Sequence, residues 1–79
     1  MPYTHFKYDM KNNKIRYIVA AISEFASKFG LTFKQATNYL IRFKGLDFLE
    51  KHYEIEHQLS FNDCVDDMAA VCKQNGGAI

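Results

Sequence analysis

The stretch GLTFKQATNYLIRFKG, residues 30–45, predicts how this chain folds back on itself. Thr32 follows the first glycine by two residues, and Gln35 follows Thr32 by three, which is the capping-box pattern of a helix N-terminus. Apolar residues then recur at the spacing of a helix with one buried face. They are Phe33, Ala36, Tyr39, Leu40 and Phe43. The stretch therefore predicts a tight turn followed by a helix over residues 33–43.

The segments on both sides of this stretch show helical periodicity as well. Before it, residues 13–29 carry an apolar stripe that predicts a first helix with one buried face. The members of this stripe are Ile15, Ile18, Val19, Ile22, Phe25, Ala26 and Phe29. After it, a shorter third helix is expected over residues 46–54. Ser60 with Asp63 three residues later predicts the start of a fourth, as a box-like pair.

No segment alternates with a period of two over enough residues to predict a strand. We therefore expect an all-α fold, a compact four-helix domain with short connections over residues 13–77. Residues 1–12 are expected to be either an N-terminal arm or an extension of the first helix. The glycines each follow a predicted helix, where a left-handed C-cap needs a residue without a Cβ. They are Gly30, Gly45, Gly76 and Gly77.

The composition argues against several classes of protein. Of the 79 residues, 48% are hydrophobic, which is enough for a folded core and too many for a disordered chain. No stretch approaches the roughly 20 apolar residues of a membrane span, and residues 1–14 lack the apolar run of a secretory signal. Cys64 and Cys72 lie eight residues apart on one predicted helix, too far to form a disulfide with each other. These features predict a cytoplasmic protein with two small buried thiols.

The charges divide unevenly along the chain although the net charge is only +1. Residues 1–45 hold eight Lys/Arg against two acidic residues, a balance of +6, and residues 46–79 hold two against seven, a balance of −5. Such a division is typical of a basic face for nucleic acid, an acidic face for a basic partner, or head-to-tail self-association. It is equally compatible with two faces that are simply solvated.

The opening stretch has an alternative interpretation as a helix-turn-helix. A small residue, a turn glycine and a second small residue occur at the spacing of that motif, in Ala26, Gly30, Leu31 and Ala36. Residues 33–43 would then be the recognition helix, and its polar residues are of types that contact bases or phosphates. They are Lys34, Gln35, Asn38 and Arg42. The pI of about 7.8 lies below the range typical of DNA-binding domains, which favours the simpler reading of a bundle helix.

No arrangement of residues predicts catalysis, a metal site or a cofactor. The possible zinc ligands match no compact spacing, and the cysteines fall on the predicted core stripe. These ligands are His52, His57, Cys64 and Cys72. An acidic patch on the last helix, Asp63, Asp66 and Asp67, is interpreted as a solvated face. His57 is expected to be structural, bonded to a backbone carbonyl and stacked on Tyr53.

One longer stretch, GLDFLEKHYEIEHQLSFNDCVDDM at residues 45–68, carries a resemblance to a known family. With FGLTFKQATNYL at residues 29–40, it resembles a family of short bacterial proteins, the domain of unknown function numbered three-seven-nine-one. The resemblance covers residues 15–76, and Glu56 stands where it leads us to expect leucine. Members of that family are encoded beside proteins resembling ADP-ribosyltransferases. The resemblance therefore implies a partner or antitoxin-like role and supplies no catalytic residues.

The sequence thus favours a non-enzymatic protein-interaction module that binds a protein partner or itself, most simply as a homodimer. The candidate partner surface comprises the predicted exposed residues Tyr17 and Ile41 and the acidic patch Asp63, Asp66 and Asp67. The alternative is a DNA-binding protein that uses residues 33–43. No membrane association is expected, and an enzyme would need a pocket that four short helices rarely provide.

Overall fold

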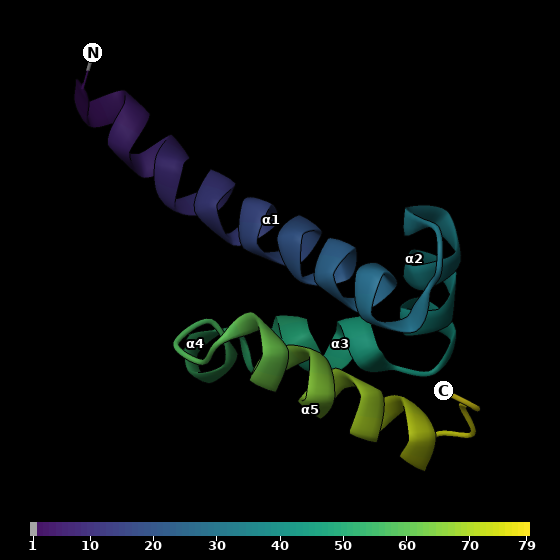
Figure 1. Cartoon of the computed structure of the whole chain (residues 1–79). Helices are drawn as coiled ribbons and strands as arrows, with labels where there is room; N and C mark the ends of the chain where they lie inside the picture. Colours follow the sequence, from purple (N-terminus) through teal and green to yellow (C-terminus); the bar gives the residue numbers. More distant parts are fainter. Residues whose placement is uncertain (1) are drawn as a thin grey trace.

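Five helices make up the computed structural model, which describes the backbone of residues 2–79 and the side chains of residues 13–79. In chain order they are α1 (Pro2–Phe29), α2 (Phe33–Arg42), α3 (Gly45–Lys51), α4 (Tyr53–Glu56) and α5 (Phe61–Gln74). No strand occurs in residues 2–79. The prediction of an all-α domain is therefore confirmed (Figure 1).

The first helix is much longer than the helices that pack on it. It has 28 residues, against 14 in α5, and the molecule is 46 Å long but only 23 Å and 20 Å across. Figure 1 shows α2, α3 and α5 gathered along the later turns of α1, while its earlier turns project beyond them. The backbone of residues 2–12 thus continues α1, and the side chains of these residues lie outside the described part. Nowhere in residues 2–79 does a helix combine the length and the apolar character needed to cross a membrane.

The core lies between the later turns of α1 and the helices α2, α3 and α5. Its largest fully buried side chains include one from each of these helices: Phe25, Leu40, Leu49 and Met68. The two cysteines of α5 are also fully buried, as the sequence predicts. Four helices thus share one core, which explains why each of them needs a single apolar face.

The connection between α1 and α2 forms as predicted. Gly30 has a φ of 67°, the left-handed conformation that ends α1. The Gln35 backbone N–H donates to the Thr32 hydroxyl at 3.0 Å, and the Thr32 N–H donates to the Gln35 side chain at 2.9 Å. At Ser60 only half of the expected box forms: the Asp63 N–H donates to the Ser60 hydroxyl at 3.1 Å.

Gly45 is a glycine for a different reason from the predicted one. The left-handed residue after α2 is Lys44, with a φ of 73°, whereas Gly45 is the buried first residue of α3. A Cβ on Gly45 would lie 2.6 Å from Leu40 Cδ2 and 2.8 Å from the Cys72 sulfur. Gly45 therefore allows α3 to approach α2 and α5 closely, and the C-cap prediction for this position was wrong.

The predicted third helix is divided in two by His52. Its φ of −110° lies outside the helical range, so α3 ends at Lys51 and the four-residue α4 starts at Tyr53. The change of direction lets Tyr53 stack on His57, with ring centroids 4.4 Å apart. The His57 ring nitrogen Nδ1 lies 2.7 Å from the Tyr53 carbonyl oxygen. The structural role predicted for His57 is thus confirmed, although the single helix over residues 46–54 was wrong.

The packing at Gly45 predicts whether a substitution there raises or lowers the stability of the fold. Alanine is the better helix former, so Gly45→Ala would stabilise α3 if there were room for the methyl group. Because Leu40 and Cys72 occupy that space, we expect the variant to be less stable by about 1–3 kcal/mol. Urea unfolding followed by circular dichroism measures this change. A variant as stable as the wild type, or more stable, would contradict the close approach of α3 to α5.

Candidate functional site

The apolar stripe of α1 is only partly covered by the other helices. Ile22 and Phe25, in the covered turns, are buried, whereas Ile15 and Val19 are 54% and 45% exposed. The prediction that the whole stripe is buried was therefore wrong for these two residues. Tyr17, which lies between them in the sequence, contacts α4 and α5, so the body packs against another side of α1 at this level and leaves Ile15 and Val19 open. An aliphatic surface remains open at the middle of the helix.

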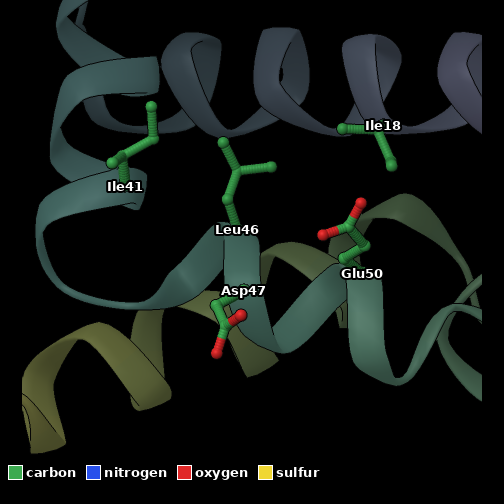
Figure 2. Close-up of a pocket in the computed structure, with 5 residues that line it drawn as sticks. All are labelled: Ile18, Ile41, Leu46, Asp47 and Glu50. Atoms are coloured by element: carbon green, nitrogen blue, oxygen red, sulfur yellow. The ribbon is translucent and has the colours of Figure 1, made fainter.

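A groove lies between α1 and the α2–α3 corner. The groove has a volume of about 380 Å³ and is lined by Ile18, Ile41, Leu46, Asp47 and Glu50. Ile18 belongs to the apolar stripe of α1. Figure 2 shows Leu46 pointing from α3 toward α1 and the Glu50 carboxylate lying close to Ile18. Ile41 is 61% exposed, as its position outside the apolar arc of α2 predicted. The groove and the exposed residues Ile15 and Val19 are called the α1 groove surface below.

The α1 groove surface has an acidic wall. Asp47 forms an exposed salt bridge of 3.2 Å with Lys51, four residues later on α3. Such pairs contribute only a few tenths of a kcal/mol, so Asp47 exchanges this partner at little cost. Within residues 13–79, the two salt bridges are this one and that between Lys28 and Asp66, and neither involves Glu50. The wall can therefore receive cationic groups beside an aliphatic floor.

Tyr17, nominated for the partner surface, packs against the body. Its hydroxyl donates to the Glu56 carbonyl oxygen at 3.0 Å. Its ring is stacked on Phe61 at 5.2 Å and meets Tyr53 edge-on at 5.7 Å. Tyr17 is half-buried by these contacts, which anchor α4 and the start of α5 to α1. The side chain therefore has an internal use, and we leave it out of the candidate surface.

The three aspartates of α5 do not act as one face. Asp63 is exposed in the first turn of α5, where a negative charge suits the helix dipole. Asp66 forms a salt bridge with Lys28 of α1. Asp67 is half-buried beside the Glu56 carboxyl. Asp66 and Asp67 thus already face groups within the chain, and Asp63 also lies near the Glu56 carboxyl.

The polar stripe of α2 is open. Lys34, Asn38 and Arg42 are exposed, while the Gln35 side chain is engaged in the capping box. Helix α2 packs on α1 and α3 through its other face, and α5 lies elsewhere (Figure 1). The acidic last helix therefore does not cover the residues proposed for DNA contact.

Within residues 13–79, the cysteines and histidines do not come together as a metal-binding cluster. Cys64 and Cys72 are free and buried, and burial raises the pKa of the Cys64 thiol to about 11. A thiol with such a pKa stays protonated and is a poor nucleophile. Within the described residues, no three His, Cys, Asp or Glu side chains come close enough together to hold a metal ion.

Glu56 is the residue that sequence reasoning missed. It is only 4% exposed, and its Oε1 atom has no hydrogen-bond partner among the side chains and backbone that the structure describes. Burial, and then the nearby Asp67 carboxyl of α5, raise the pKa of Glu56 to about 7. Asp63 and Cys64 of α5 and Tyr17 of α1 also face this region. The only sequence signal was that leucine was expected at this position.

The buried carboxyl predicts a pH-dependent stability. The pKa of Glu56 is about 7 in the folded chain and near 4.5 when unfolded, so folding favours the protonated form. The contribution of Glu56 to the free energy of unfolding is greatest below about pH 4.5 and is lost as the pH rises to about 7. Glu56→Gln keeps the shape and cannot ionise. We expect the free energy of unfolding of the variant to exceed that of the wild type by about 1–2 kcal/mol at about pH 8, and by little at about pH 5.

Thermal unfolding across this pH range measures the difference, with Glu54→Gln as the matched control. Glu54 lies two residues earlier on the same short helix but is exposed, so its substitution is expected to leave the pH profile unchanged. A Glu56→Gln difference that does not vary with pH would show that the Glu56 carboxyl is not buried in the protonated form.

Comparisons with known proteins identify a family and no activity. The family described as "Protein of unknown function (DUF3791)" matches residues 16–75, which is most of the chain and includes α2 to α5. No curated protein and no solved structure matches the chain. The function must therefore be argued from the surface described above.

Proposed function

We propose that this chain, which belongs to the DUF3791 family, is a cytoplasmic protein-interaction module that binds an α-helix of its partner. The observation that carries the proposal is the α1 groove surface. It combines a concave aliphatic floor with exposed aliphatic residues on the same helix. A partner or antitoxin-like role is the form of this function that the family resemblance implies.

Burial of these side chains supplies the driving force for binding. Ile15, Val19 and Ile41 each expose about half or more of their surface, and covering such a side chain is favourable by about 1 kcal/mol or more. Neighbouring apolar residues that line a groove are typical of helix-in-groove recognition, in which an amphipathic helix presents residues at i, i+3, i+4 and i+7. A helix thus suits this surface better than a small molecule, because the groove is open to solvent.

The acidic wall specifies the charge of the partner. Asp47 and Glu50 border the aliphatic floor, so a helix with Lys or Arg beside its apolar stripe is favoured. A helix with acidic flanks is disfavoured by like-charge repulsion. The free, buried cysteines agree with a reducing compartment such as the cytoplasm.

A pair of isoleucines provides a matched test of this surface. Ile41 lies in the groove and is 61% exposed, whereas Ile55 lies on α4 outside the groove and is 64% exposed. The probe is a labelled synthetic amphipathic helix with a leucine stripe flanked by lysines, and a glutamate-flanked version serves as its control. We expect Ile41→Glu to weaken binding of the lysine peptide about tenfold or more, and Ile55→Glu to leave it unchanged.

Fluorescence anisotropy measures the affinity, and NMR shift changes locate the bound peptide. The expected shifts centre on Ile18, Ile41 and Leu46. Equal losses from the two isoleucine substitutions, or equal binding of the lysine and glutamate peptides, would contradict the proposed docking mode.

DNA binding through α2 is kept as a second candidate because the polar stripe of α2 is open. It predicts binding to a short DNA duplex that weakens steeply between about 50 and 200 mM salt. Replacing Lys34 and Arg42 by alanine is expected to lower the slope of log affinity against log salt by about 2. Anisotropy of labelled duplex measures this slope. No binding at the lower salt concentration would remove this candidate.

A further inference from the structure

We infer that the helix bound by the α1 groove surface is α1 of a second copy of this chain, which packs antiparallel so that each copy fills the other's groove. This inference rests on the proposed function and names its partner. Three features of the chain support it: the length of α1, the position of its exposed apolar residues and its charge.

The earlier turns of α1 project beyond the helices packed on it. Helix α1 spans about 42 Å at 1.5 Å per residue, and α2, α3 and α5 gather along its later turns (Figure 1). Helical segments of this length are marginal in water, and tertiary packing of an apolar face normally stabilises them. A second copy of the chain would supply such packing.

The exposed apolar residues of α1 lie where a two-fold axis would place them. The helix runs from Pro2 to Phe29, so Ile15 and Val19 are near its midpoint. In a symmetric antiparallel pair, two residues that lie equally far from the two-fold axis on opposite sides contact each other across the interface. Ile15 of one copy therefore packs on Val19 of the other. The projecting turns of each α1 then lie along the covered turns of its partner, beside the groove that contains Ile18.

The charges complement each other in this arrangement. Residues 2–16 contain four Lys/Arg against Asp9, a balance of +3. The groove that these turns approach is bordered by the carboxylates Asp47 and Glu50. In an antiparallel pair, the basic start of one copy lies beside the acidic wall of the other. The basic and acidic parts of the chain thus attract each other across the interface.

The first test is the molar mass in solution. Light scattering after gel filtration is expected to show a dimer of the wild type that dissociates on dilution. Ile15→Asp with Val19→Asp is expected to give a folded monomer, because both side chains are already about half exposed and lie outside the core. Circular dichroism at high concentration confirms that the variant remains helical. A dimer that persists in this double variant would overturn the inference.

The second test exchanges charges between the two parts of the interface. Variant A carries Asp47→Lys and Glu50→Lys, and variant B carries Lys14→Glu and Arg16→Glu. In a dimer of variant A alone, or of variant B alone, α1 of each copy meets a wall of the same charge on the other copy. We therefore expect the self-association of each variant to weaken about tenfold or more. In a mixture, the basic α1 of A meets the acidic wall of B, and the acidic α1 of B meets the basic wall of A. The mixture is therefore expected to form a heterodimer.

A matched control separates specific pairing from general attraction. Variant C carries Lys34→Glu and Arg42→Glu, the same charge change placed on the open stripe of α2. Variant C is expected to dimerise like the wild type and to form no heterodimer with variant A beyond that formed by the wild type. Equal pairing of A with B and with C would overturn the α1 assignment.

Two outcomes distinguish this inference from the proposed function. A strictly monomeric chain that still binds the lysine-flanked peptide through Ile41 would overturn the second copy as the partner and leave the docking surface standing. A monomeric chain that binds neither peptide would overturn both.

Discussion

The incomplete cover of α1 by the helices packed on it is the constraint on which the rest of this structure depends. Phe25 is fully buried in the later turns of α1, and Leu40, Leu49 and Met68 close around it from three other helices. The same apolar stripe includes Val19 and Ile15, which stay about half exposed. One helix therefore supplies both the core and the surface proposed for binding, because the packed helices cover only part of a single periodic stripe.

The two ends of the body differ in how well they are packed. At one end, Gly45 allows α3 to lie against Leu40 and Cys72 with no space to spare. At the other end, Tyr17 holds α4 by a hydrogen bond to the Glu56 backbone, while the buried Glu56 side chain has one oxygen without a hydrogen-bond partner among the described residues. Stabilising aromatic packing and an unfavourable buried carboxyl thus meet at the same junction.

Local features were predictable from the sequence because their causes are local. The capping box of Thr32 and Gln35, the left-handed Gly30 and the stacking of His57 on Tyr53 all involve residues within four positions of each other. Errors arose where distant segments meet. Gly45 was assigned a turn role because its actual neighbours, Leu40 and Cys72, come from other helices. Glu56 gave no periodic signal, since α4 has only four residues.

The sequence by itself determined that the chain is an all-α domain, where α1 ends, where α2 lies and where α5 begins, and which residues form the apolar stripes of α1 and α2. These properties follow from residue spacing and caps, which act within one or two turns. Only the tertiary structure decided how much of each apolar face is covered. Ile15 and Ile22 are equivalent in the pattern, yet one is open and the other buried. The reason is that burial depends on the relative lengths and approach of whole helices, and no single helix encodes either.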